Sequence, residues 1–309
     1  MSDDVTAALA RAGRFRTLAE QALADRPLGP EAALGVLRAD DGEVADVLWA
    51  AFAVRARHFG RRVKLCILNN ARSGLCPEDC GYCSQSAVAT SDIPRYRLKS
   101  VTELVAAARH AAATGARRYC MVTSARGPSA RDIEHVARAA RAIRAELPDI
   151  ELCASLGLME DRAATALHDA GIDFVNHNLN TSRRFYPEIC TTHTYDDRLA
   201  TVQSVRRAGL RLCSGVIVGM GETDEDVLDV LRDLRDHRVD VVTIGQYLQP
   251  TERHLPLDRW VTPAEFAEYR RAGEALGFAS VFAGPLVRSS YRADEQRLAA
   301  RGESRAVAH

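Results

Sequence analysis

The sequence predicts an α/β protein built on a TIM-type (β/α) barrel, complete or short of one strand, with a helical extension at its N-terminus. From residue 63 onward, β-rich runs alternate with helical patterns. From the second strand on, successive strands begin about 25 to 40 residues apart, a spacing typical of repeated βα units and a parallel sheet. Seven strands can be counted, where eight would close the barrel. The predicted boundaries are a helical extension over 1–60, the barrel over 61–297 and a polar tail over 298–309.

The individual elements follow from hydrophobic periodicity and from interruptions by proline and glycine. Two amphipathic helical patterns, 6–23 and 31–58, are separated by a segment with two prolines and a glycine, 26–30. The predicted strands are 63–68, 118–123, 150–155, 174–178, 211–218, 241–245 and 280–284. The helical patterns between them are 101–114, 130–147, 161–170, 196–208, 224–236 and 263–276. Active sites of such barrels lie at the carboxyl ends of the strands, where the first strand leads into a cysteine-rich loop.

Composition argues against several classes of function. Lys+Arg and Asp+Glu both total 41, so no net charge attracts nucleic acid or an anionic membrane. The chain has no run of 18 apolar residues and no signal-peptide pattern, which predicts a cytoplasmic protein that does not interact with membranes. Eight cysteines in a reducing compartment indicate metal binding rather than disulfides.

Three cysteines, Cys76, Cys80 and Cys83, follow the first strand on one short loop. Cube-shaped iron–sulfur clusters are held by thiolates from such loops, and three protein ligands leave one iron open for a small molecule. The alternative is a structural zinc site, which requires four closed ligands. No fourth Cys or His follows nearby, because the next His is His110. The spacing therefore favours an iron–sulfur site.

The loop has the form C-x3-C-x-aromatic-C, with Tyr82 as the aromatic residue, and it resembles the loop of radical S-adenosylmethionine (SAM) enzymes. The resemblance implies a [4Fe–4S] cluster on Cys76, Cys80 and Cys83 whose open iron chelates the amino and carboxylate groups of SAM. An electron from this cluster, supplied by a flavodoxin- or ferredoxin-type donor, would break the sulfonium bond. The resulting 5′-deoxyadenosyl radical would remove hydrogen from an unactivated carbon, while the protein positions the reactants and excludes water.

Three further cysteines, Cys120, Cys153 and Cys213, each lie inside a predicted strand. Taken singly, a cysteine in a strand is usually a small buried hydrophobic residue. Taken together, inward-facing positions on three strands converge on the barrel axis. Three thiolates at the axis could hold a second cluster.

This arrangement resembles biotin synthase over about residues 60–235. The segments that carry the resemblance are 74–83, 176–182, 191–195 and 213–223. The resemblance implies that the three strand cysteines are catalytic. They would ligate an auxiliary cluster, [4Fe–4S] or [2Fe–2S], that is consumed as the sulfur donor.

The same resemblance implies a set of polar residues around SAM. Asn176 and Asn178 would contact substrate or SAM, and Gly221 and Glu222 would shape the SAM pocket together with Tyr82. Asn180 stands where the family usually has an aspartate that meets the SAM ribose. An amide can still form a hydrogen bond with a hydroxyl.

The resemblance changes after about residue 240. Biotin synthases carry an arginine on a late strand as the fourth ligand of the auxiliary cluster, and the corresponding strand, 280–284, has none. Three segments instead resemble lipoyl synthase: 243–251, 254–256 and 284–293, the last of which contains Arg-Ser-Ser-Tyr-x-Ala. That resemblance, over about 240–297, implies that Ser289 or Ser290 is a ligand of the auxiliary cluster. A chain that combines both families also resembles the two-component lipoyl synthases, in which two related radical SAM proteins share the two sulfur insertions.

The sequence therefore predicts a radical SAM sulfurtransferase that acts at unactivated C–H carbons. The preferred substrate is an octanoyl chain on a carrier protein, with Gln246, Tyr247 and Gln249 lining its pocket, and the alternative is dethiobiotin converted to biotin. A radical SAM enzyme without sulfur insertion and a non-catalytic cluster-carrying protein are further alternatives. A sister radical SAM protein and a homodimer are the remaining expected partners.

Four other Cys and His residues are expected to have structural roles rather than to bind metal. Cys190 has no partner at cluster spacing, and Cys66 lies inside the first predicted strand, so both are expected to be packing residues. His177 and His193 are expected to be hydrogen-bonded residues of the core or the rim rather than metal ligands.

Overall fold

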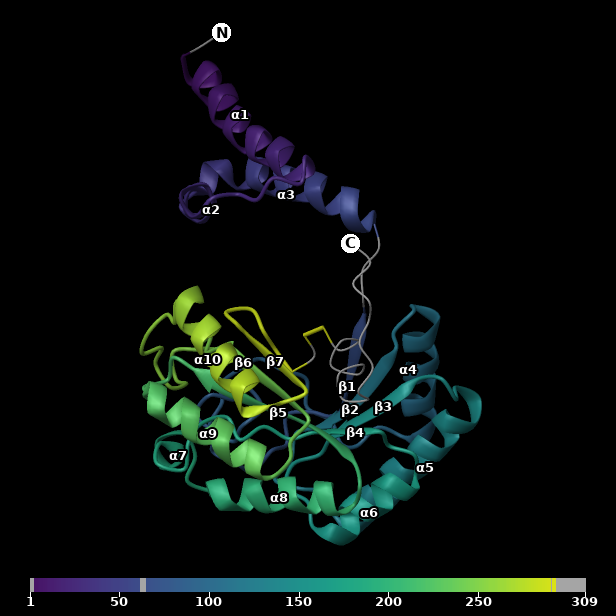
Figure 1. Ribbon diagram of the computed structural model, residues 1–309. Coiled ribbons are helices and arrows are strands. Elements are labelled where there is room, and N and C mark those ends of the chain that lie inside the picture. Colours follow the sequence, from purple (N-terminus) through teal and green to yellow (C-terminus); the bar gives the residue numbers. More distant parts are fainter. Residues whose placement is uncertain (1–2, 62–64, 290, 293–309) are drawn as a thin grey trace. The chain divides into compact units, whose positions relative to one another are not determined.

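The computed structural model describes residues 3–61, 65–289 and 291–292 (Figure 1). They belong to two compact units, one within Met1–Val63 and the other within Lys64–Ala306. The predicted polar tail, the candidate ligand Ser290 and the side chain of Cys66 lie outside the described residues.

The N-terminal unit is helical. It consists of α1 (Asp3–Leu23), α2 (Pro30–Leu37), the 3-10 helix η1 (Asp41–Glu43) and α3 (Val44–Phe59). Phe15, Ala19 and Ala50 form its buried core. The prediction of one helix over 31–58 was wrong. The chain leaves the helix after Leu37 and starts again at η1, where the Asp40 backbone amide donates to the Glu43 carboxylate at 3.2 Å.

The larger unit contains one parallel sheet of seven strands, paired in the order in which they occur in the chain. The strands are β1 (Cys66–Arg72), β2 (Arg118–Thr123), β3 (Glu151–Ser155), β4 (Phe174–Asn176), β5 (Arg211–Val218), β6 (Val241–Gln246) and β7 (Ser280–Gly284). β1 and β7 are the two edges of the described sheet. This sheet confirms the predicted α/β fold, a TIM-type barrel that is incomplete.

Helices follow the strands and surround the sheet on its outer side (Figure 1). They are α4 (Val101–Ala113), α5 (Ala130–Glu146), α6 (Asp161–Asp169), α7 (Tyr186–Ile189), α8 (Tyr195–Arg207), α9 (Asp224–Asp236) and α10 (Pro263–Leu276). Five of them begin after a Ser or Thr whose side chain accepts a hydrogen bond from the amide three residues on: Ser100, Ser129, Thr194, Thr223 and Thr262. The short α7 was not predicted, because four residues are too few to show a helical period. No helix in the described residues has both the length and the apolar character needed to cross a bilayer.

Successive side chains along the strands point to opposite faces of the sheet and form two buried layers. Tyr119, Met121 and Leu152 belong to the large core that also contains the buried faces of the helices. Cys120 and Cys153 belong to a smaller cluster that contains strand residues only. Because neighbours along a strand point to opposite faces, the smaller cluster lies on the inner face of the sheet.

β1 also continues four residues beyond its predicted end at Leu68, into a polar segment. Asn69 is buried there, its amide donates to the Tyr119 hydroxyl at 2.7 Å, and its oxygen accepts from Lys99 at 2.8 Å. These partners allow a polar residue inside the strand.

Candidate functional site

The Cys76–Cys83 loop leaves the carboxyl end of β1 and is closed by local hydrogen bonds. Ser73 pairs with Tyr96, and the Gly74 amide donates to the Gln85 side chain at 2.7 Å. Gly74 has φ +70, and a Cβ there would lie 2.5 Å from the Arg95 side chain, so this turn requires glycine. The turn and its closure hold Cys76, Cys80 and Cys83 on one compact loop.

Burial disfavours the charged form of all three loop thiols. It raises the pKa of Cys76 and of Cys83, and the pKa of Cys80 is raised by the hydrogen bond that it donates to Cys190 and by burial. The Arg198 guanidinium opposes this rise at each thiol. Metals bind the thiolate, so Arg198 supplies part of the charge compensation that a cluster on this loop requires.

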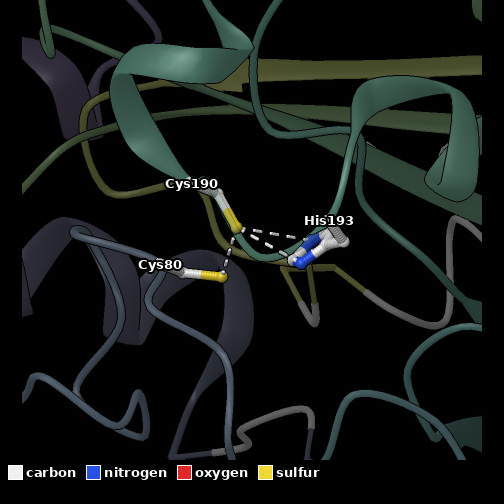
Figure 2. Close-up of side chains that lie close together, drawn as sticks. All are labelled: Cys80, Cys190 and His193. Atoms are coloured by element: carbon white, nitrogen blue, oxygen red, sulfur yellow. Dashed lines mark hydrogen bonds between the residues drawn. The ribbon is translucent and has the colours of Figure 1, made fainter.

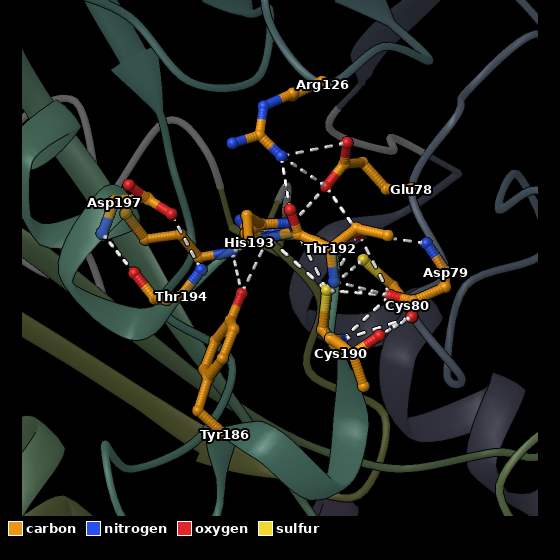
Figure 3. Close-up of polar contacts among 12 residues, drawn as sticks. Glu78, Asp79, Cys80, Arg126, Tyr186, Cys190, Thr192, His193, Thr194 and Asp197 are labelled. Carbon is orange, nitrogen blue, oxygen red and sulfur yellow. Dashed lines mark hydrogen bonds and ion pairs between the residues drawn. The ribbon is translucent and has the colours of Figure 1, made fainter.

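Two carboxylates attach the cysteine loop to the segment that follows α7 (Figure 3). Asp79 accepts hydrogen bonds from the backbone amides of Thr191 and Thr192, at 3.0 and 3.2 Å. Glu78 accepts from the Thr192 hydroxyl at 2.7 Å and contacts the His193 ring. Although burial acts in the other direction, the hydrogen bonds from Thr191 hold the pKa of Asp79 well below its ordinary range. Both carboxylates therefore act as charged acceptors that position the loop.

The same attachment brings Cys80, Cys190 and His193 together (Figure 2). The Cys80 thiol donates to Cys190 with the sulfurs 3.6 Å apart, and the Cys190 sulfur lies 3.2 Å from His193 Nδ1. The sequence-based interpretation of Cys190 and His193 missed this proximity. Their Cys-x2-His spacing was an available signal, because closely spaced Cys and His pairs are typical of metal sites.

A partly buried guanidinium lies beside the loop. Arg198 donates to the Asn178 carbonyl at 3.0 Å and, at 3.5 Å, to the hydroxyl of Tyr82, the aromatic residue of the cysteine motif. The Asn180 amide also donates to the Tyr82 hydroxyl, at 2.6 Å. Asn180 was predicted at the SAM ribose, and the structure places its side chain against Tyr82.

A cavity of about 230 Å³ opens at the carboxyl ends of β5 and β6. Its lining consists of Tyr82, Asn178, Gly215, Val216, Ile217, Thr243, Gly245, Gln246, Tyr247, Leu248, Val287, Arg288 and Ser289. The Asn178 carboxamide oxygen is buried without a hydrogen-bond partner among the described residues, and a ligand in the cavity could supply one. Gln249 was predicted to line the pocket but is not part of this lining, and its amide donates to the His254 carbonyl at 3.2 Å.

A glycine-containing loop adjoins this cavity. Glu222 is buried, and its carboxylate accepts from the amides of Gly219 and Met220 at 2.6 and 2.9 Å. Gly219 has φ +96, and a Cβ there would lie 2.3 Å from the side-chain nitrogen of Gln246, which lines the cavity. Gly221, with φ +117, lies in the same turn. Glu222 therefore holds the turn through its carboxylate, beside the cavity.

The three strand cysteines lie in one buried layer inside the sheet. Cys120 of β2 is paired with Cys153 of β3, and Asn176 of β4 is paired with Cys213 of β5. Among the described residues, the three cysteines form a cluster with Phe174 and Val241, and no helical residue takes part. The next inward positions on β5 and β6 are Gly215 and Thr243, which line the cavity, so this thiol layer lies one inward position below the cavity.

The pKa values of two of these thiols are shifted in opposite directions. A hydrogen bond from Cys120 lowers the pKa of Cys153, and the nearby Arg118 guanidinium acts in the same direction. Burial raises the pKa of Cys213 to about 12. Arg118 also forms an ion pair with Glu151 and lies 4.2 Å from the Phe174 ring centre. A cationic residue therefore lies next to the thiols, where thiolate ligands would add negative charge.

Comparison with known proteins agrees with this arrangement. The sequence profile of the radical SAM superfamily matches residues 72–234, which is more than half of the chain. Two solved structures share the fold. Methylornithine synthase PylB is 19% identical with a TM-score of 0.58, covering 86% of this chain and 85% of its own. The hydrogenase maturase HydG of Carboxydothermus hydrogenoformans is 17% identical with a TM-score of 0.61, covering 92% of this chain and 68% of its own.

The similar sequences include several biotin synthases. Biotin synthase 2 of Frankia casuarinae is 50% identical over 220 residues, which are 71% of this chain and 61% of that protein. A biotin synthase of Thermus thermophilus is 48% identical, over 72% of this chain and 68% of that protein. Biotin synthase of Magnetococcus marinus is 42% identical, over 80% of this chain and 77% of that protein. The chain spans less than two thirds of the Frankia protein and more than two thirds of the other two. It belongs to the radical SAM superfamily and, within it, to the biotin synthase-like proteins.

Proposed function

We propose that this chain is a radical SAM sulfurtransferase that inserts sulfur at unactivated C–H carbons. The observation that carries the proposal is the presence of two thiol sets on one barrel. The first lies on the loop that leaves β1, and the second lies inside the sheet on β2, β3 and β5, beneath the cavity.

The residues suit the cofactors that family membership implies, namely SAM, a [4Fe–4S] cluster and an auxiliary iron–sulfur cluster. We assign the SAM-binding cluster to Cys76, Cys80 and Cys83, because thiolates on one loop are the ligand set of such clusters. When bound, this cluster and SAM supply the one-electron chemistry that activates a C–H bond. Tyr82 belongs to this loop and lines the cavity. Arg198 and Asn180 position it by donating hydrogen bonds to its hydroxyl.

We assign the auxiliary, sulfur-donating cluster to Cys120, Cys153 and Cys213. Ser289 is the proposed oxygen ligand. It lines the cavity that lies above these thiols and belongs to the segment that resembles lipoyl synthase. The buried position of the thiol layer would restrict access of water and of other thiols to the sulfur donor.

Dethiobiotin is the substrate that the sequence relatives support best, because the similar proteins include biotin synthases that are 42–50% identical. A protein-bound octanoyl chain, as in lipoate formation, is the second candidate. It is favoured by one specific observation: Val287, Arg288 and Ser289, from the lipoyl synthase-like segment, line the cavity. An electron donor of the flavodoxin or ferredoxin class would serve either reaction.

Product analysis separates the candidates. The reconstituted protein is incubated under reducing, oxygen-free conditions with SAM and either dethiobiotin or an octanoyl-lysine peptide, and the products are identified by mass spectrometry. Biotin supports the first candidate, and a thiolated octanoyl peptide supports the second. Formation of 5′-deoxyadenosine without sulfur in either substrate would contradict the proposal and leave a radical SAM enzyme that does not insert sulfur. Absence of 5′-deoxyadenosine would leave a non-catalytic cluster carrier.

A glycine in β6 provides a test of the cavity lining. A Cβ on Gly245 would lie 2.3 Å from the Val287 carbonyl oxygen and 3.1 Å from Arg288 Nη1, so Gly245→Ala must displace this part of the lining. We expect sulfur insertion to fall about 10- to 100-fold, because misplacement by about 1 Å has effects of this size, with uncoupled SAM cleavage retained. Gly284→Ala is the matched control, because its Cβ would make only an ordinary contact, 3.4 Å from Val287. Equal rates of sulfur insertion in the two variants would show that the 287–289 segment does not shape the site.

A further inference from the structure

Cys80, Cys190 and His193 come from segments about 110 residues apart in the chain, yet their ligand atoms lie within 4.8 Å of one another. All three side chains are nearly inaccessible, with exposures of 6%, 4% and 5%. In Figure 2 both other side chains point toward the Cys190 sulfur. Two thiols and an imidazole in one buried spot are a typical ligand set for zinc.

The distances agree with tetrahedral coordination by one ion. Two Zn–S bonds of about 2.3 Å at the tetrahedral angle place the sulfurs about 3.8 Å apart, and one Zn–S with one Zn–N bond places those atoms about 3.6 Å apart. The Cys80 and Cys190 sulfurs are 3.6 Å apart, and the Cys190 sulfur lies 3.2 Å from Nδ1 and 3.9 Å from Nε2 of His193. The Cys80 sulfur and the nearer ring nitrogen of His193 lie within 4.8 Å of each other.

We propose that the cluster-free chain binds one divalent transition-metal ion of the zinc class through Cys80, Cys190 and His193. Cys190 and His193 lie outside the C-x3-C-x2-C loop, so this ligand set differs from the assigned [4Fe–4S] ligand set. The two sites share Cys80, and one thiolate cannot complete both. The ion and the [4Fe–4S] cluster therefore exclude each other, a consequence that rests on the assignment of Cys80 in the proposed function.

Neighbouring side chains can orient the ligands and balance their negative charges. Glu78 contacts His193 Nδ1, but the ligand atoms that lie within 4.8 Å of one another are those of Cys80, Cys190 and His193, so the Glu78 side chain must shift to become the fourth ligand. His193 Nε2 lies 2.8 Å from the Tyr186 hydroxyl, a contact that orients the ring as outer partners of metal-bound histidines do. Two thiolates and the Glu78 carboxylate carry three negative charges. These are balanced by the two positive charges of the ion and by Arg198, whose Nε lies 3.1 Å from His193 Nε2.

The test uses Co²⁺ as a spectroscopic substitute for zinc in the full-length, cluster-free protein, with thiols reduced and oxygen excluded. Tetrahedral Co²⁺ with thiolate ligands gives intense visible and charge-transfer absorption that reports geometry and sulfur ligation. The parent variant is Cys76→Ser/Cys83→Ser, which removes the other two loop thiols. It keeps the proposed ligands and the three strand cysteines, which therefore contribute equally when Cys190→Ser or His193→Gln is compared with the parent variant.

We expect the parent variant to bind Co²⁺ with a tetrahedral thiolate spectrum. Adding Cys190→Ser should weaken this binding at least 100-fold, and adding His193→Gln at least tenfold. Adding Cys153→Ser is the control for removal of a buried thiol elsewhere and should leave this signal in place. Circular dichroism and the urea midpoint of each variant establish that it is folded. A Co²⁺ spectrum that is absent from the folded parent variant, or that is unchanged by Cys190→Ser, would overturn the site.

A second readout tests the exclusion. Wild-type protein preloaded with Zn²⁺ should take up less iron and sulfide on reconstitution, by about four of each per chain, than metal-free protein, since a cube cluster holds four irons. In Cys190→Ser, preloading should have no such effect. If Co²⁺ binds through Cys190 but Zn²⁺ leaves cluster uptake unchanged, the metal site stands, and it is the assignment of Cys80 to the SAM cluster that is wrong.

Discussion

Cys120→Ser is expected to abolish sulfur insertion while leaving SAM cleavage close to its normal rate. Cys120 lies in the buried thiol layer beside Cys153, away from the loop that carries Cys76, Cys80 and Cys83. Loss of this ligand should prevent assembly of the sulfur donor without affecting the SAM-binding cluster. We expect the sulfur-containing product to fall at least about 100-fold, a loss of about 2.7 kcal/mol or more, while 5′-deoxyadenosine formation stays within about threefold.

The experiment measures both products in one reaction and counts iron and sulfide per chain. A loss of about four irons with SAM cleavage retained would point to an auxiliary [4Fe–4S] cluster, and a loss of about two to a [2Fe–2S] cluster. Met121→Leu is a suitable control, because Met121 occupies the next position on β2 but faces the helices, and the change nearly conserves volume. An equal loss of both products in Cys120→Ser would argue against a separate sulfur-donor cluster.

Gly157→Ala is expected to destabilise the barrel by at least about 3 kcal/mol. Gly157 has φ +92, and a Cβ there would lie 2.4 Å from the Arg126 carbonyl oxygen and 2.8 Å from that of Ala125. Backbone atoms cannot yield as a flexible side chain can, so the β2–α5 connection must move. Gly115→Ala is the matched control, with φ +86 and no atom within 4 Å, and it should lose only about 1 to 2 kcal/mol through backbone strain.

Urea unfolding of the cluster-free proteins measures the difference. The position also bears on the site, because the Leu158 amide donates to the Arg126 carbonyl at 2.7 Å, and the Arg126 side chain contacts Glu78 on the cysteine loop at 3.4 Å. If a destabilised but folded Gly157→Ala protein still assembles its clusters, this connection supports the fold without positioning the loop. Equal unfolding midpoints for the two alanine variants would show that the close approach is relieved by small shifts.

Elements with strong local signals could be predicted from the sequence. The strands 118–123, 211–218 and 280–284 and the helices 224–236 and 263–276 occupy the residues that their patterns indicate. The hydrophobic period of each of these elements can be seen within a short stretch of sequence, and a Ser or Thr cap marks the start of several helices. The break between α2 and α3 was missed although Asp-Asp-Gly at 40–42 is a local turn signal, because the apolar periods on either side were taken as one helix.

The site shows the same division. The cysteine motif is a local spacing, and the strand cysteines lie at inward positions that strand alternation can indicate. The hydrogen bonds among Arg198, Tyr82 and Asn180 join three separate segments of the chain, so no local sequence pattern predicts them. Cys190 was assigned to packing for the same reason, since its nearest thiol, that of Cys80, is 110 residues away in sequence.

The amino-acid sequence by itself determined the parallel α/β architecture and the loop that carries Cys76, Cys80 and Cys83. Both depend on interactions among residues close together in the chain, so spacing and periodicity are enough to reveal them. Only the tertiary structure decided that Cys190 and His193 lie beside Cys80 and that Asn180 supports Tyr82. Those contacts join loops at the carboxyl ends of different strands, and it is the closure of successive βα units around a common axis that brings these ends together.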